Sequence, residues 1–140
     1  MPSCTFFGHS DAPEETEPIL KSIIIELIKS KKVNMFYVGD NGRFDKIVQN
    51  ILLYLTKEHI IKSYVVLAYL PNKHISYKLE TLLPEEFEFV PKRFAISYRN
   101  KWMIEKSDYV ITYVTRSFGG AYKAKMLAEK KGKNIINVTI

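Results

Sequence analysis

The feature that most constrains this chain is a unit that recurs along it: a short apolar run followed by a segment with apolar residues at helical spacing. The apolar runs cover residues 4–7, 33–39, 63–70, 108–115 and 134–138, and the helical patterns cover 17–29, 44–55, 94–106 and 121–131. Near-continuous apolar runs predict strands that are covered on both faces, as in parallel sheets. Their alternation with helices predicts one domain over residues 1–140, a Rossmann-like three-layer α/β sandwich with a mainly parallel, doubly wound sheet.

The stretch after the third apolar run breaks this regularity. It contains Pro71, Pro84 and Pro91. Within it, residues 76–83 fit a helix and residues 87–90 fit a short strand.

Composition limits the classes of protein that fit. The 140 residues are 46% hydrophobic, so the chain can bury a core. Lys and Arg number 21 against 15 Asp and Glu, and the formal net charge of +6 favours anionic partners. The lysines are scattered, however, which is more typical of solvated helix ends than of a nucleic-acid interface. The apolar stretches are far shorter than the roughly 20 residues that cross a bilayer, and no signal segment is recognised, so a cytoplasmic protein without a membrane partner is expected.

Three of the apolar runs end in a glycine-containing turn that leads into a helical pattern. The turns read FGHSD at 7–11, VGDNGRFD at 38–45 and TRSFGGA at 115–121. The carboxyl ends of parallel strands meet at one edge of a sheet, where doubly wound proteins bind ligands. Glycine permits close backbone approach, and a helix N-terminus offers N–H groups and partial positive charge, a combination that favours phosphate. The sequence predicts a ligand site there, with candidate residues Gly8, His9, Ser10, Gly39, Gly42, Asp45, Arg99, Thr115, Ser117, Gly119 and Gly120.

Several candidates have more than one role open. His9 could contact phosphate, act as an acid or base, or be an exposed turn residue. Arg99 falls beside the apolar stripe of the 94–106 helix, so it needs a structural carboxylate or a ligand phosphate as its partner. Asp45 suits the first turn of a helix, and near a ligand it is expected to face ribose hydroxyls rather than phosphate. Asp11 could cap a helix.

Familiar catalytic and metal-binding motifs are absent from the sequence. It contains no GxxxxGK[ST] loop, no GxGxxG fingerprint and no GxSxG elbow. Cys4 is the one cysteine and lies in an apolar run, whereas His59 and His74 lie in polar surroundings and are expected on the surface. No disulfide, metal site or cofactor is therefore expected.

The motifs of the C-terminal part resemble a known superfamily. The segment RNKWMIEKSDYVITYVTRSFGGAYKAKMLAEKKGKNIINV, residues 99–138, is similar to the SLOG superfamily of Lonely Guy phosphoribohydrolases, lysine-decarboxylase-like proteins and Smf DNA-processing proteins. Arg99 and Lys101 match the arginine–lysine pair of the Lonely Guy proteins, and Gly119 and Gly120 match their glycine turn. VGDNGRFD resembles a second glycine turn of the superfamily. The likeness extends over nearly the whole chain and comes closest to small single-domain members from Gram-positive bacteria and their phages, with FGH near the start and VPKRFAI before the arginine helix.

This resemblance implies a Rossmann-like domain that binds a nucleotide or nucleotide-derived ligand at the glycine turns and forms a homodimer. Catalysis is not implied with it, because Met126 or Lys123 occupies the position where the hydrolases have a glutamate. We therefore expect a nucleotide-binding sensor or regulatory module. One alternative is a nucleoside 5′-monophosphate phosphoribohydrolase in which Asp45, Asp11 or Glu105 supplies the carboxylate. The other is a single-stranded nucleic acid binder, which the scattered charge ranks last.

Overall fold

The computed structural model describes residues 2–70 and 75–140, and its strands form one parallel sheet. The elements are β1 (Ser3–Gly8), α1 (Thr16–Lys31), β2 (Met35–Val38), α2 (Arg43–Thr56), β3 (Lys62–Val66), β4 (Glu80–Leu82), η1 (Glu85–Phe87), η2 (Lys92–Phe94), α3 (Ala95–Lys106), β5 (Tyr109–Tyr113), α4 (Gly120–Lys130) and β6 (Asn134–Asn137). The strand order is β4-β3-β2-β1-β5-β6, and every pairing is parallel. The predicted α/β fold class is confirmed, and the sheet is parallel throughout the described residues rather than mainly parallel.

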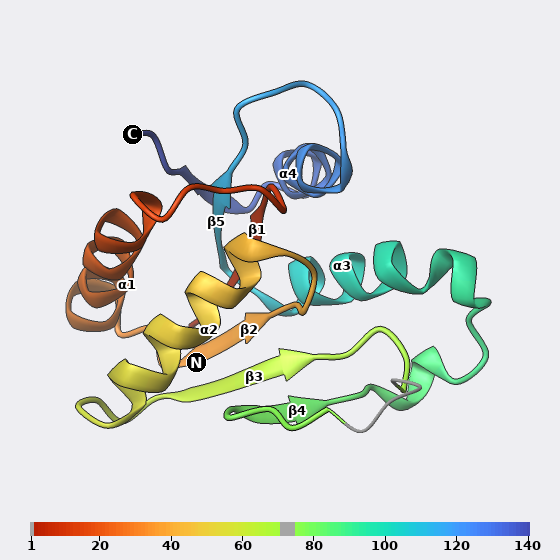
Figure 1. The fold of residues 1–140 in the computed structure, drawn as a ribbon, viewed down its shortest axis with the longest axis horizontal. Coiled ribbons are helices and arrows are strands. Elements are labelled where there is room, and N and C mark those ends of the chain that lie inside the picture. The colour runs from red at the N-terminus through yellow and green to blue at the C-terminus, as the bar shows by residue number, and fades with distance from the viewer. Residues whose placement is uncertain (1, 71–74) are drawn as a thin grey trace.

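Helices cover both faces of the sheet (Figure 1). From β1 the chain moves outward through α1 and α2 to β3 and the edge strand β4, and it then returns through α3 to β5 on the other side of β1. Right-handed crossovers in these two directions put α1 and α2 on one face and α3 and α4 on the other. The direction of winding reverses between β1 and β5, which makes this the switch point of the sheet.

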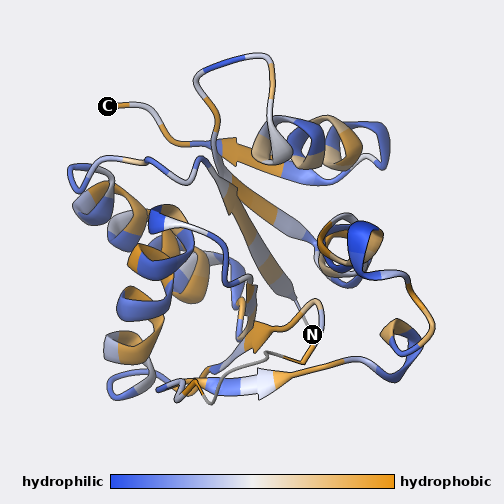
Figure 2. Ribbon diagram, turned by 45° about the vertical axis from the view of Figure 1, so that its right-hand side comes forward, coloured by the Kyte–Doolittle hydropathy of each residue, from blue (hydrophilic) through white to orange (hydrophobic). Residues whose placement is uncertain are grey.

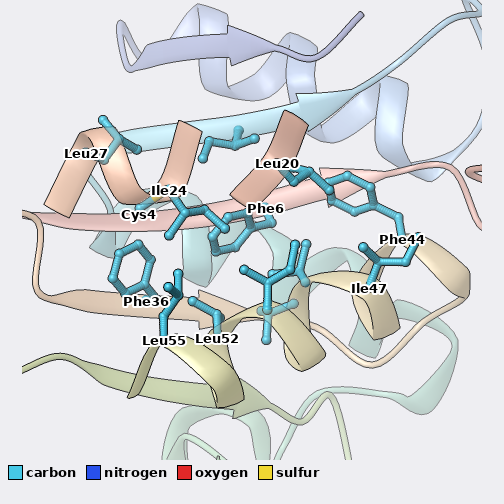
Figure 3. Packing of buried hydrophobic residues seen from close by; sticks show 14 of the residues in the cluster. Cys4, Phe6, Leu20, Ile24, Leu27, Phe36, Phe44, Ile47, Leu52 and Leu55 are labelled. Carbon is cyan, nitrogen blue, oxygen red and sulfur yellow. The ribbon is translucent and has the colours of Figure 1, made fainter. Parts of the chain in front are cut away.

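Each face has its own hydrophobic cluster. On the first face, side chains of α1 and α2 such as Leu20, Ile24 and Leu52 pack against Phe6 and Phe36 of the strands (Figure 3). On the second face, side chains of α3 and α4 pack against Phe7, Val66 and Val110. The central strands are largely hydrophobic and the helices carry both hydrophobic and hydrophilic residues (Figure 2). Burial on two faces explains why the strands read as continuous apolar runs.

The irregular middle of the chain differs from both local predictions. The helix expected at 76–83 is wrong, because Glu80–Leu82 is instead the edge strand β4, paired with β3. The short strand expected at 87–90 is also wrong, because Glu85–Phe87 is a 3-10 turn in which the Phe87 N–H bonds to the Pro84 carbonyl. Tertiary pairing with β3 overrides the weak helical pattern, whereas residues 87–90 pair with no strand in the part of the chain that the structure describes.

Two further expectations concern the surface. His59 is partly exposed, and His74 lies outside the described residues. Within residues 2–70 and 75–140, no helix combines the length and the apolar character needed to cross a membrane.

Candidate site at the carboxyl edge of the sheet

The three predicted turns follow β1, β2 and β5, which are neighbours in the sheet. Because these strands are parallel, the turns meet at one edge, beside the switch point. There they line a small crevice of about 60 Å³ together with α3. The crevice walls include Gly8, Asn41, Asp45, Arg99, Asn100 and Gly120. Residues predicted from three separate turns and from a helix are therefore brought together.

Gly39 makes room for two charged side chains beside this crevice. A Cβ atom at Gly39 would lie 2.9 Å from Asp45 Oδ2 and 3.0 Å from Arg99 Cζ. Real Cβ atoms rarely approach other atoms so closely, so any larger residue would displace the carboxyl group or the guanidinium. Both side chains are buried, with 7% of Asp45 and 5% of Arg99 exposed.

The carboxyl group of Asp45 is electrostatically unusual. Burial raises its pKa to about 7, against the opposing effects of Arg99 and of the Asn41 N–H, which donates to Asp45 Oδ2 at 2.9 Å. The nearby carboxylate of Asp40 adds to the increase in pKa. Asp45 thus exchanges its proton near neutral pH, with Arg99 as its nearest cation.

Arg99 has no ion pair within 4 Å among the described residues, where such pairs join Arg116 to Asp11 and Lys131 to Glu105. Its Nε and Nη2 donate to Asn100 Oδ1 at 3.3 and 3.1 Å. Burial lowers its pKa, while Asp45 and then Asp40 raise it. The structural carboxylate considered for Arg99 is therefore nearby but not in direct contact, and the guanidinium faces cavity space.

His9 links two of the turns. Only 3% of its surface is exposed, which contradicts an exposed turn residue, and its Nε2 accepts the Thr115 N–H at 3.0 Å. Burial and the Arg116 charge lower its pKa, whereas Asp11 raises it. Asp11 pairs with Arg116 at 3.3 Å, which lowers the Asp11 pKa, instead of capping a helix. His9 therefore positions the turn after β5.

Positive backbone angles occur where two of the helices begin. Gly42 and Gly119 are the N-cap residues of α2 and α4, with φ of 104° and 95°. Ser10 packs against Gly42, since a Cβ there would lie 2.5 Å from Ser10 Cβ, and its carbonyl accepts the Arg43 N–H. By contrast, a Cβ atom built at Gly119 or at Gly120 would have no other atom within 4 Å. Ser117, in the same turn, is exposed. The start of α4 thus lies open, whereas the start of α2 is covered.

Gly8 has a structural reason to be glycine. A Cβ atom there would lie 2.2 Å from Cγ of Phe44, whose side chain is fully buried in α2. The residue lines the crevice, but its lack of a side chain serves the packing of α2 on β1.

Two larger cavities continue the crevice along the edge. The first, which we call the Arg99 cavity, measures about 350 Å³ and shares Asn41 and Arg99 with the crevice. Its other walls include Asp40, Tyr69, Tyr77 and Lys92. A second cavity of about 510 Å³ shares Tyr69 and Lys92 with the first and adds Leu70, Phe87 and Val90. We call the three adjoining cavities the edge groove.

Sequence reasoning missed most of the groove walls. Asp40 and Asn41 lie within the quoted VGDNGRFD turn and could have been chosen there. Tyr69 follows β3, which ends at Val66 rather than at residue 70, so its place at the same edge was recoverable once a parallel sheet was assumed. Tyr77 and Lys92 come from the irregular segment, and no local pattern indicates them.

The fold and these cavities define a doubly wound α/β protein with its candidate ligand site at the carboxyl ends of the strands. A solved structure with this fold is that of DNA processing protein A from Helicobacter pylori, which has a unique single-stranded DNA binding mode. The match has a TM-score of 0.64 and 17% sequence identity, and it covers 96% of this chain and 63% of that one. No protein-family model matches the chain, and no curated protein matches it. The likeness shows the fold, and this chain spans less than two thirds of the neighbour's length.

Proposed function

We propose that this protein binds single-stranded nucleic acid in the edge groove. The observation that carries the proposal is the groove itself, in which three adjoining cavities share cationic and aromatic walls. Proteins that bind single strands combine positive charge along a backbone path with aromatic side chains on which bases stack. Lys92 and Arg99 supply the charge, and Tyr69, Tyr77 and Phe87 supply the rings.

Exposed apolar side chains support the same surface. More than half of the large exposed hydrophobic residues lie between Tyr69 and Tyr98, in the segments around the groove. The ring of Phe89 is 87% exposed, and the cations of Lys92 and Arg93 lie over the rings of Tyr69 and Phe94 at 4.9 and 4.8 Å. The scattered charge in the sequence ranked nucleic acid last, but folding places the cations Lys92 and Arg99 beside aromatic rings at one edge. Acidic side chains of Asp40, Asp45 and Glu88 line the same groove.

The similarity to DNA processing protein A adds weight to this proposal, since that protein binds single-stranded DNA. It also accords with the sequence resemblance to the SLOG superfamily, which includes DNA-processing proteins. We propose on both grounds that the chain is a single SLOG-type domain, and that it forms the homodimer implied by that resemblance.

Fluorescence anisotropy with a labelled thymidine dodecamer tests strand binding. Each phosphate contact should contribute a slope of about −0.7 to log K against log salt, so Lys92→Ala should reduce the slope by about that amount. Arg99→Gln should weaken binding about tenfold, because it removes a charged hydrogen bond to a base acceptor, which is O4 in a thymidine strand. Lys31→Ala removes the same charge from the exposed end of α1, at the opposite edge of the sheet, and should change neither quantity. Two results would refute the proposal. One is no binding of the dodecamer at low salt, and the other is binding by Lys92→Ala and Arg99→Gln that is as strong as binding by the unaltered protein.

A free nucleotide is the second candidate ligand. The volume of the Arg99 cavity, without its neighbours, already lies within the roughly 300–1,000 Å³ range of small-ligand sites. A nucleotide-binding sensor would be stabilised by about 2.7 kcal/mol at a ligand concentration of 100 times its Kd. A thermal-shift series with nucleoside monophosphates and dinucleotides separates the candidates. Stabilisation by a mononucleotide without binding of the dodecamer would favour the sensor.

Hydrolysis is the least supported candidate. Lys123 and Met126 are exposed on α4, and Glu129 lies more than two helical turns from the open start of that helix. Asp45 is the buried carboxyl group at the crevice, so hydrolysis of a nucleoside monophosphate would have to be lost in Asp45→Asn.

A further inference from the structure

The Arg99 cavity contains a cation and an anion that face it without meeting. Arg99 and Asp40 both line the cavity, yet no ion pair joins them within 4 Å among the described residues. Their charges interact, since the carboxylate of Asp40 raises the pKa of Arg99. A guest that contacts both must accept hydrogen bonds from Arg99 and donate hydrogen bonds to Asp40.

Both groups keep hydrogen-bonding capacity. Arg99 has five N–H donors, and the bonds to Asn100 use one on Nε and one on Nη2. Asp40 receives the Tyr77 hydroxyl at Oδ2. Since each carboxylate oxygen has two lone pairs, Oδ1 and part of Oδ2 can still accept.

The remaining walls suit a flat ring. Tyr69 and Tyr77 are aromatic, Leu67, Ala68, Ile75 and Ile96 are apolar, and Asn41 and Lys92 are further polar walls. Such walls stack with any nucleobase, so they give affinity without choosing a base. The choice of base must come from polar groups, and of these Arg99 offers adjacent donors and Asp40 offers two adjacent acceptor oxygens.

Guanine is the base that offers two adjacent acceptors to Arg99 and two adjacent donors to Asp40. Its O6 and N7 are adjacent acceptors that a guanidinium contacts with two bonds. Its N1–H and N2–H groups are adjacent donors, which the two oxygens of a carboxylate can accept together. Adenine, cytosine and thymine each lack a pair of adjacent donor groups.

We propose that the Arg99 cavity is a nucleobase pocket that selects guanine, with Arg99 donating to O6 and N7 and Asp40 accepting from N1–H and N2–H. This inference rests on the proposed binding of single strands and adds the identity of the preferred base. It gives Arg99 a base edge as its partner and leaves phosphate contact to Lys92.

The test uses thymidine strands with one central base changed to guanine, inosine, 7-deazaguanine or adenine. Anisotropy should show the tightest binding for guanine, and inosine and 7-deazaguanine should each bind about 5-fold or more weaker, because each lacks one contact of a bidentate pair. Asp40→Asn should abolish the difference between guanine and inosine. Glu105→Gln, which neutralises an exposed carboxylate on α3, should preserve it.

The two proposals fail in different ways. If no strand binds, strand binding and the base pocket are both refuted. If all four strands bind equally, or if Asp40→Asn keeps the preference for guanine over inosine, the base pocket alone is refuted. The comparison of bases on the unaltered protein needs no variant, so a misfolded substitution cannot hide the answer.

Discussion

Replacement of Asp45 by asparagine should reverse a stability cost that grows with pH. Burial raises the pKa of this carboxyl group from 3.8 to about 7. A group with a raised pKa binds more protons in the folded state than in the unfolded state, so stability falls as pH rises between the two pKa values and is constant above them. Each pH unit well inside that window costs about 1.4 kcal/mol, and the unaltered protein should lose about 2.3 kcal/mol from this group between pH 5 and pH 7, where the folded group is half ionised.

Urea denaturation of both proteins between pH 5 and pH 8.5 measures this cost. Asparagine keeps an oxygen that accepts the Asn41 N–H but does not ionise. The free energy of unfolding of Asp45→Asn, relative to that of the unaltered protein, should therefore rise with pH up to about pH 7 and stay nearly constant above it. Other titrating groups cancel in the difference between the two proteins. If the difference in unfolding free energy did not change between pH 5 and pH 8.5, Asp45 would be ionised beside Arg99 throughout this range. That result would refute the raised pKa of Asp45. Asp11→Asn is a control, since Arg116 lowers the pKa of this exposed carboxyl group from 3.8, and the difference that it causes should not change with pH between 5 and 8.5.

Two further outcomes follow from the contacts at the same edge. Gly8→Ala should destabilise the fold by about 3 kcal/mol, because its Cβ would lie 2.2 Å from the buried ring of Phe44. Gly120→Ala has open space around its Cβ and should leave the thermal midpoint unchanged or raise it. Equal thermal midpoints for the two variants would contradict the packing argument. By NMR, His9 should titrate below 6.5 and the Thr115 amide should lose its protection from exchange in His9→Phe, while a His9 that titrates above 6.5 would contradict a neutral, accepting imidazole.

The fold class could be predicted from the sequence because strands that are buried on both faces have a recognisable local pattern. Apolar runs and helical stripes each persist over enough residues to be recognised, and the glycine turns mark where strands pass into helices. The predicted residues of those turns do meet at one edge. Local pattern could not show that the short β4 would pair with β3, because edge pairing depends on a partner that is distant in the sequence.

The candidate site was less accessible for a physical reason. Its turn residues sit at strand ends, but the walls of the edge groove are formed by the segment between β3 and α3, whose shape depends on tertiary contacts. Tyr77 reaches Asp40 across 37 residues of sequence, and Lys92 lies in a 3-10 turn. His9 was found by its position in a turn, but its role as a buried acceptor depends on Thr115, 106 residues away.

The central place of β1 has a consequence for how the chain is made. Cys4 pairs with Tyr109, so the second neighbour of β1 is synthesised about 100 residues after β1 itself. Until β5 emerges from the ribosome, one edge of β1 has no partner, and an unpaired strand edge is a template for aggregation. The switch point therefore cannot form until β5 has been synthesised. A protein with this topology depends on rapid capture of its late strand, or on a chaperone that shields the waiting edge.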